Sequence, residues 1–248
     1  MTTKNPQKTT TIYGSRAVFE AIASGKTIEK VWLLKSNQST QFKELQKQLH
    51  QHNINVSYVP KERLERFDQK NHQGVVAQMA IVATVEFETL VEYIEDKQNP
   101  LFLLLDGVTD VRNFGAILRT AAAVGVDGVI IPSSGSAPLN GDVVKTSAGG
   151  IFKVSIAKVN HLKDVIYQLQ QLDFSLLAIT EKTKTSIYDN DYKGPIAIIL
   201  GSEDKGISKG ILKIVKQQVK IPMAETTDSL NVSVAAAVAL YEIVRQRL

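Results

Sequence analysis

The sequence contains no cysteine, no long apolar run and no apolar segment at its N-terminus. The lack of cysteine excludes disulfide bonds, thiolate metal sites and a cysteine nucleophile. No apolar run approaches the roughly 18 residues of a membrane-spanning helix, so we expect no integral membrane segment. The opening residues, MTTKNPQKTTT, lack the apolar core of a secretory signal. These absences together predict a cytoplasmic protein.

The composition is that of a folded protein with an uneven distribution of charge. Hydrophobic residues make up 44% and charged residues 22% of the 248 positions, which excludes a disordered or low-complexity chain. The length predicts one large domain or two small ones. The formal net charge is +4, but residues 1–83 carry +6 and residues 84–100 carry −4. The basic first third fits a face that binds a polyanion, although a solvated basic surface explains the charge equally well.

Two α/β patterns follow each other along the chain, separated by the acidic segment. We expect a disordered tail over 1–10, a first domain over 11–83, a linker over 84–100 and a second domain over 101–248. Leu90, Val91 and Ile94 suggest a short helix within the linker. Several predicted strands of the second domain are continuous apolar runs, which is typical of parallel strands covered on both faces. The predicted strands there lie at 101–106, 128–131, 153–156, 174–180, 196–201 and 219–222, and the helices at 113–124, 161–172, 208–217 and 229–247. The fold class is therefore α/β with two domains.

The segment DGVTDVRNFGAILRTAAAVG (106–125) passes from a predicted strand through a polar turn into a helix. Asn113 is placed to cap that helix. Arg112 and Arg119 lie seven residues apart, or two helical turns, so both side chains point away from the apolar face. Solvated arginines would show the same pattern. Their position outside the carboxyl edge of a parallel sheet favours a ligand site, because open α/β sheets bind ligands there.

The segment IAIILGSEDKGIS (196–208) again reads as a strand, a glycine loop and a helix. Gly201 and Gly206 have the spacing of a phosphate-binding loop, but the residue after Gly206 is isoleucine where that loop carries lysine. Glu203 and Asp204 place two negative charges in the loop, and these would repel phosphate. The loop therefore suits a neutral or cationic ligand, such as a ribose or a sulfonium, unless it is an ordinary βα turn.

The segment IPMAETTDSLNVSVAAAVALYEIV (221–244) leads into the last predicted helix. Ser229 is placed at the N-cap of that helix. Asn231 lies in its first turn, near the positive end of the helix dipole. The small residues of the helix allow close packing against another element, either within the domain or across a dimer interface.

The three segments are expected to meet at one edge of the sheet, because the carboxyl ends of parallel strands lie together. None of them holds a complete nucleophilic triad, a metal-ligand cluster or a dinucleotide-binding glycine motif. These absences argue against an NTPase or a dehydrogenase. The four histidines lie outside all three segments, so we give none of them a role.

Together the three segments resemble the signature motifs of the SpoU (TrmH) family of RNA ribose 2′-O-methyltransferases. NFGAILRTA (113–121) is similar to the family's N-x-G-x-I-x-R-T-A, and LGSEDKG (200–206) is similar to its L-G-x-E-x-x-G. IPM (221–223) and SLNVSVA (229–235) are similar to its third motif. The order and approximate spacing also agree. Residues 12–83 resemble the family's N-terminal substrate-binding domain more loosely, through IYGSRAVFEAI and QGVVA.

The resemblance implies S-adenosylmethionine as methyl donor, with S-adenosylhomocysteine as product and no metal. It implies a SPOUT-type catalytic domain tied in a trefoil knot, a homodimer built on that domain, and a smaller N-terminal α/β substrate-binding domain of the ribosomal-protein type. General topology rules argue against knots, so the knot follows from the resemblance alone. The cofactor-binding residues that it implies are Gly201, Ile221 and Leu230, with Thr180, Leu200 and Met223 beside them. Family members often have glycine at the positions of Asp204 and Glu225, so the loop backbone is expected to differ there.

The catalytic residues that the resemblance implies are Arg119, Asn113, Glu203, Ser229 and Asn231. Methyl transfer to a ribose hydroxyl is an in-line displacement, and alignment of the reacting atoms lowers its barrier. A guanidinium is almost never deprotonated, so we hypothesise that Arg119 stabilises alkoxide charge or binds the adjacent phosphate bidentately. Near-normal turnover of Arg119→Lys would contradict that role. Glu203 is the competing base, unless it orients Arg119 or Asn113.

A separate basic N-terminal domain suits a large folded RNA as partner. By family analogy it favours the ribose of a guanosine in 23S rRNA. One alternative is the same chemistry on a guanosine of the tRNA D-loop, although relatives that act there have short terminal extensions. Another is a non-catalytic RNA-binding protein on the same fold, which predicts damaged motifs, whereas the motif residues of this chain are intact. No membrane partner is expected.

Overall fold

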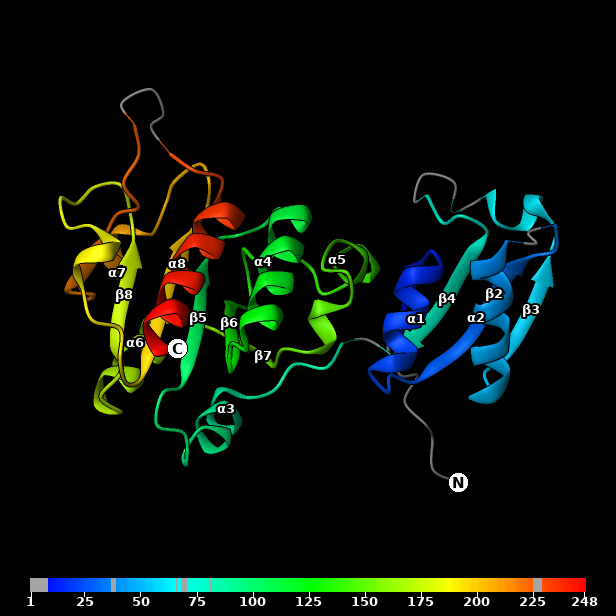
Figure 1. Ribbon diagram of the computed structural model, residues 1–248, viewed down its shortest axis with the longest axis horizontal. Helices are drawn as coiled ribbons and strands as arrows, with labels where there is room; N and C mark the ends of the chain where they lie inside the picture. Colours follow the sequence, from blue (N-terminus) through cyan, green and yellow to red (C-terminus); the bar gives the residue numbers. More distant parts are fainter. Residues whose placement is uncertain (1–8, 37–38, 66, 68–70, 81, 225–228) are drawn as a thin grey trace. The chain divides into compact units, whose positions relative to one another are not determined.

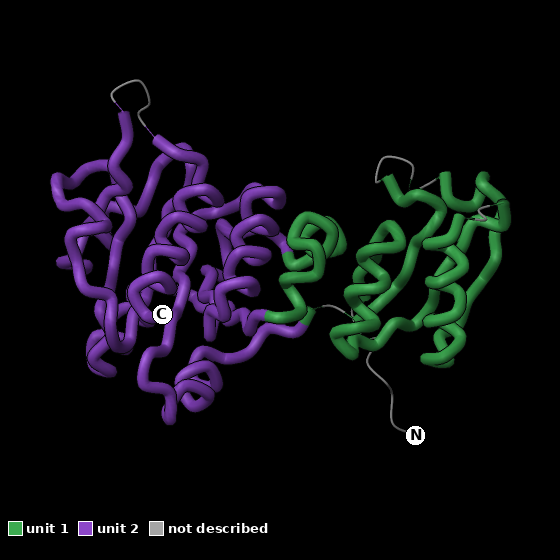
Figure 2. Tube along the Cα trace, viewed as in Figure 1, with its two compact units in different colours: residues 1–82, 139–153 green, residues 83–138, 154–248 purple. Residues whose placement is uncertain are grey.

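The computed structural model describes residues 9–36, 39–65, 67, 71–80, 82–224 and 229–248. Most of the predicted tail 1–10, and Glu225, therefore lie outside the described residues. Two compact units are present, residues 1–82 with 139–153 and residues 83–138 with 154–248 (Figure 2). The first unit thus includes a short segment that the sequence assigned to the second domain. The domain boundaries drawn from the sequence stay a prediction.

The first unit is built on a mixed sheet. Its elements are β1 (Thr9–Tyr13), α1 (Ser15–Ala23), β2 (Ile28–Leu34), α2 (Thr40–Gln51), β3 (Val56–Val59), η1 (Lys61–Arg63), β4 (Val75–Ala80), α5 (Gly141–Thr146) and η3 (Gly150–Phe152). Among the described residues the strand order is β1-β4-β2-β3, with β2 and β3 parallel and β4 antiparallel to both of its neighbours. Helix α2 buries Phe42, Leu45 and Leu49, which the helical repeat brings to one face.

The second unit is built on a parallel sheet. Its elements are α3 (Phe87–Tyr93), β5 (Leu101–Asp106), α4 (Val111–Val124), β6 (Gly128–Pro132), β7 (Ile156–Val159), α6 (Leu162–Gln171), β8 (Ser175–Ile179), η4 (Ile187–Asp189), β9 (Ile196–Gly201), α7 (Lys209–Leu212), β10 (Gln217–Val219) and α8 (Val232–Arg247). The strand order in the described residues is β10-β8-β9-β5-β6-β7, and every pairing is parallel. The predicted α/β class is confirmed.

Helices cover both faces of the parallel sheet, which explains its continuous apolar strands. Phe102 and Leu104 of β5 face a core that also contains buried residues of α3 and α6. On the other face α4 packs against α8, and the two helices lie side by side in Figure 1. The central strand β9 is buried at all of its residues. No helix in the described ranges is long and apolar enough to cross a membrane.

Two predicted helix caps are wrong, and in both cases another residue holds the position. Asp110 caps α4, and its carboxylate accepts the backbone N–H groups of Arg112 and Asn113 at 2.9 and 2.8 Å. Asn231 caps α8 in place of Ser229. The first correction matters for the site, because Asn113 lies inside the first turn and its side chain is available for a longer-range contact.

Near the C-terminus, α8 carries a buried carboxylate. The Arg245 guanidinium donates two 2.8 Å hydrogen bonds to Glu242, and the Gln246 amide donates a third at 2.7 Å. The hydrogen bonds from Arg245 hold the pKa of Glu242 below its ordinary value. The stability that this contact supplies is present above the unfolded-state pKa and is lost as the pH falls through the folded-state pKa.

We therefore expect Glu242→Gln to lower the Tm by up to about 3 °C at neutral pH. The difference from wild type should shrink as the pH falls below about 4. Thermal unfolding followed by circular dichroism between pH 3 and pH 7 measures it. A Tm difference that stays constant over that range would show that the ionised form of Glu242 contributes nothing.

Candidate active site

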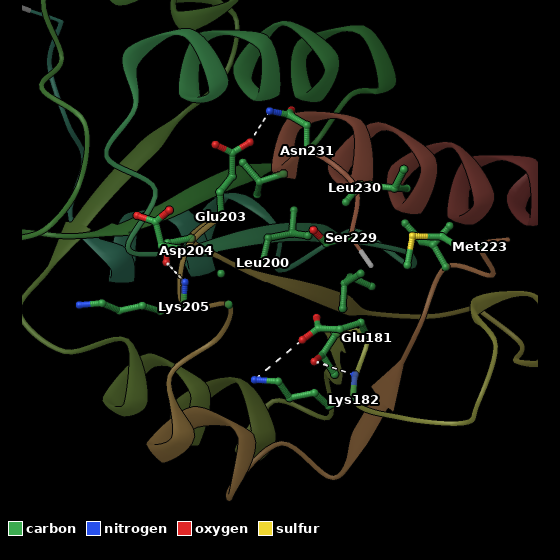
Figure 3. Close-up of a pocket in the computed structure, with 18 residues that line it drawn as sticks. Glu181, Lys182, Leu200, Glu203, Asp204, Lys205, Met223, Ser229, Leu230 and Asn231 are labelled. Atoms are coloured by element: carbon green, nitrogen blue, oxygen red, sulfur yellow. Dashed lines mark hydrogen bonds and ion pairs between the residues drawn. The ribbon is translucent and has the colours of Figure 1, made fainter. Parts of the chain in front are cut away.

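Three segments that follow parallel strands, together with the start of α8, line one pocket of about 590 Å³ (Figure 3). They are 180–182 after β8, 201–206 after β9, 221–223 after β10, and 229–232 at the start of α8. The second and third sequence motifs therefore meet at the carboxyl edge of the sheet, where ligands of open α/β sheets bind.

Every residue that the sequence indicated for cofactor binding lines this pocket. Those residues are Gly201, Ile221, Leu230, Thr180, Leu200 and Met223. Thr180 is buried, and its hydroxyl accepts the backbone N–H of Lys182 at 3.3 Å, which fixes the turn after β8. The structure brings these positions together, and their role in binding stays a prediction.

The loop after β9 folds back onto its own first residue. A Cβ at Gly201 would lie 2.0 Å from the Gly206 carbonyl carbon and 2.1 Å from the Ile207 nitrogen. The Gly206 N–H donates to the backbone carbonyl oxygen of Ser202 at 2.9 Å, and Gly206 has a φ of +65°. Gly201 is thus needed for close backbone approach, and Gly206 for a left-handed conformation.

Three polar side chains from three segments form a cluster at the pocket. The Asn231 amide nitrogen donates to the Asn113 amide oxygen at 3.0 Å and also to the Glu203 carboxylate. Figure 3 shows the Glu203 and Asn231 side chains pointing toward each other. The structure therefore connects one residue from each of the three motifs, and Glu203 orients Asn113 through Asn231.

Ser233 is a member of this cluster that the sequence analysis missed. Its hydroxyl and its backbone N–H both donate to the Asn231 amide oxygen, at 2.6 and 2.9 Å. With the oxygen held there, the amide nitrogen of Asn231 must face Glu203 and Asn113. The signal was an Asn followed two residues later by Ser at a helix start, a local arrangement in which the side-chain oxygen accepts nearby N–H and O–H groups.

We expect Ser233→Ala to lower kcat about threefold to tenfold with an unchanged KM for the methyl donor. The variant removes one of the two hydrogen bonds that the Asn231 amide oxygen accepts from Ser233, and one such bond contributes about 1 kcal/mol. Steady-state methyl transfer measures both constants. Ser233→Thr keeps the hydroxyl and should restore most of kcat; a Thr variant as slow as the Ala variant would contradict the orienting role.

The arginines of the first motif are not among the described residues that line the pocket. Arg112 and Arg119 are both exposed on α4, as the helical repeat predicted. Ser229 does line the pocket. The structure thus joins Asn113, Glu203 and Asn231 by hydrogen bonds, whereas Arg119 is exposed on α4, the helix that also carries Asn113.

Charged side chains surround the mouth of the pocket. Glu181, Glu203 and Asp204 line it together with Lys182 and Lys205. Glu181 and Lys182 are paired at 3.8 Å. The described residues contain no group of three or more His, Asp or Glu side chains arranged to hold a metal ion.

Two family models match the chain. Residues 100–241 match the SpoU rRNA Methylase family, and residues 11–84 match RNA 2′-O ribose methyltransferase substrate binding. The chain is also similar to the 23S rRNA (guanosine-2′-O-)-methyltransferase RlmB of Haemophilus influenzae. The identity is 36% over 240 residues, covering 96% of this chain and 98% of that protein.

Solved structures share the fold. The SpoU methyltransferase AviRb from Streptomyces viridochromogenes, in complex with AdoMet, gives a TM-score of 0.81 at 24% identity, covering 96% of this chain and 89% of that one. An AdoMet-bound rRNA methyltransferase from Sinorhizobium meliloti gives 0.79 at 24% identity, covering 97% and 88%. The matched models and the near full-length relative confirm the enzyme class predicted from the three motifs. This protein belongs to the SpoU rRNA methylase family, a family of RNA methyltransferases.

Proposed function

We propose that this enzyme transfers a methyl group from S-adenosylmethionine to the ribose 2′-hydroxyl of a guanosine in 23S rRNA. The observation that carries the proposal is the pocket at the sheet edge, where the six positions indicated for the cofactor meet Glu203, Ser229 and Asn231. The similarity to RlmB of Haemophilus influenzae supports the choice of rRNA and of guanosine.

The pocket fits the proposed cofactor in size and chemistry. Its volume of about 590 Å³ lies within the range of small-molecule sites, roughly 300–1,000 Å³. Ile221, Leu230 and Met223 supply apolar surface for a purine ring. Three carboxylates and two lysines line the pocket, and the excess of one negative charge suits a ligand that carries positive charge. When bound, the cofactor supplies a methyl group already activated on a sulfonium centre.

Residues of this chain then align the ribose 2′-hydroxyl that accepts the methyl group and stabilise the negative charge that develops on its oxygen. Asn113 and Asn231 are neutral groups held in fixed orientations, which suits them to position a ribose. Glu203 holds the amide nitrogen of Asn231 and is an acceptor for the hydroxyl proton. We propose that Arg119 binds the phosphate next to the reacting ribose or stabilises the alkoxide charge that develops on the ribose oxygen. The guanidinium suits both roles because it stays protonated.

We further propose that the catalytic unit forms a homodimer, is tied in a trefoil knot and works in the cytoplasm. The dimer is supported by α8, which is apolar around most of its circumference. Its Val234 and Tyr241 are 47% and 55% exposed although α4 already covers one side of the helix. The knot is supported by membership of the family.

Ligand-induced stabilisation tests the cofactor assignment. A ligand that binds only the folded state stabilises it by about 2.7 kcal/mol at a hundred times its Kd. S-Adenosylhomocysteine should therefore raise the Tm by several degrees, whereas ATP and NAD should leave it unchanged. A Tm that rises with ATP or NAD and not with S-adenosylhomocysteine would contradict the proposal and favour a nucleotide-binding protein.

A further inference from the structure

A second cavity, of about 260 Å³, lies within the first unit. Tyr13 and Arg16 reach it from the junction of β1 and α1, Asn71 and Gln73 from the turn before β4, and Lys145 from α5. It is therefore built by three separate segments of the chain. None of its lining residues belongs to the pocket at the edge of the parallel sheet.

The segment 139–153 is held in place against β1 and α1 by close backbone approach. A Cβ at Gly141 would lie 1.7 Å from the Thr11 carbonyl oxygen. A Cβ at Gly149 would lie 2.5 Å from the Cβ of Glu20. This packing positions Lys145, whose ammonium donates to the Asn71 carbonyl oxygen at 3.2 Å. Gly141 and Gly149 thus allow the segment 139–153 to pack closely against β1 and α1, and this packing places Lys145 at the cavity.

Two cations, Arg16 and Lys145, and no Asp or Glu are among the described residues that line the cavity. Of the neighbouring acids, Glu20 on α1 lies 3.8 Å from the ammonium of Lys153, and Asp142 lies in the first turn of α5 and does not line the cavity. Asn71 and Gln73 add amide groups, and Tyr13 adds the edge of an aromatic ring whose centroid lies 5.8 Å from that of Phe67. Two cations, amides and one ring are the groups that proteins use to bind a phosphate next to an unpaired nucleotide.

We propose that this cavity binds a phosphodiester of the RNA substrate, with Arg16 and Lys145 on the phosphate oxygens and Tyr13 beside the adjacent unpaired nucleotide. A volume of about 260 Å³ admits a phosphate with part of a nucleoside. The family model for substrate binding covers the residues that line the cavity from β1, α1 and the turn before β4. The inference rests on the proposed function, since it names a site that binds the RNA substrate of the proposed reaction.

Filter binding of an unmodified 23S rRNA transcript to the full-length chain tests the proposal without requiring methyl transfer. The test variant is Arg16→Gln with Lys145→Gln. The control is Lys43→Gln with Lys47→Gln, which removes the same charge from the exposed face of α2. The test variant should weaken RNA binding at least about tenfold and reduce the slope of log K against log salt by about 2. The control should weaken binding less than threefold.

Binding of S-adenosylhomocysteine and the Tm should be the same in both variants, because all four side chains are exposed. RNA binding by the test variant equal to that of the control would overturn the inference, as would a wild-type chain that does not bind the transcript. A wild-type chain that binds RNA but transfers no methyl group would instead overturn the proposed function. A selective loss in the test variant would then still support a phosphodiester site.

Discussion

Asn231→Asp is expected to lower the rate of methyl transfer at least about a hundredfold while changing the free energy of unfolding by less than about 1 kcal/mol. Aspartate keeps an oxygen that accepts the Ser233 N–H, and it caps a helix as well as asparagine does. The amide nitrogen, however, becomes a second carboxylate oxygen facing Glu203 and the Asn113 oxygen. The donor that joins the cluster is lost, and like charges push its members apart. A displacement of about 1 Å at reacting groups costs roughly a hundredfold in rate.

The measurement is the initial rate of transfer from labelled S-adenosylmethionine, with urea unfolding alongside it. Asn99→Asp is the matched control, because Asn99 is exposed, lies outside the pocket and accepts the Gly194 N–H at 2.9 Å through its own side-chain oxygen. That variant should keep its rate within twofold of wild type. If Asn231→Asp retained half the wild-type rate, the hydrogen bonds of the cluster would have no part in catalysis.

The second large effect is expected at Gly201. A Cβ there would overlap the backbone of Gly206 and Ile207. Backbone atoms cannot move aside through a change of rotamer, as a side chain can. Gly201→Ala must therefore displace the loop that lines the pocket. We expect a loss of about 3 kcal/mol in the free energy of unfolding and a Kd for S-adenosylhomocysteine raised at least tenfold. Urea unfolding and isothermal titration calorimetry measure the two quantities.

Gly206→Ala distinguishes the effect of steric overlap, expected at Gly201, from the effect of a left-handed backbone conformation. A Cβ at Gly206 would meet nothing within 4 Å, but its φ of +65° strains any residue with a side chain. The expected cost is about 1 kcal/mol, with the loop path preserved. Equal losses of stability in the two variants would show that close approach at Gly201 does not set the shape of the loop.

Four strands of the second unit were predictable because burial on both faces leaves a continuous apolar run, whereas β7 and β10 lie about three and two residues from the predicted 153–156 and 219–222. The segments 101–106 and 196–201 are β5 and β9 with the expected bounds. The segment 84–100 carries α3, the short helix that Leu90, Val91 and Ile94 indicated, and its Phe87 and Leu90 are buried in the core. The acidic composition gave no sign that this helix packs into the core, because its few apolar side chains all fall on the one face that packs.

Helix starts and long-range contacts could not be predicted in the same way. Asp110 and Asn113 are both good caps, as are Ser229 and Asn231, so residue type alone cannot choose between them. The path of the preceding loop makes that choice. Glu203 and Asn231 are 28 positions apart, and no local pattern reports their contact. The motifs indicated which residues matter, and only the fold showed that Asn231 joins the other two.

Methyl transfer from radiolabelled S-adenosylmethionine to unmodified 23S rRNA, with bulk tRNA transcripts as a parallel substrate, tests the central claim most directly. Mapping by alkaline cleavage locates the label, because a 2′-O-methyl group makes the adjoining phosphodiester resistant. The account predicts label on rRNA at one alkali-resistant guanosine. Label on tRNA alone would contradict the substrate, and label on neither RNA would contradict the function.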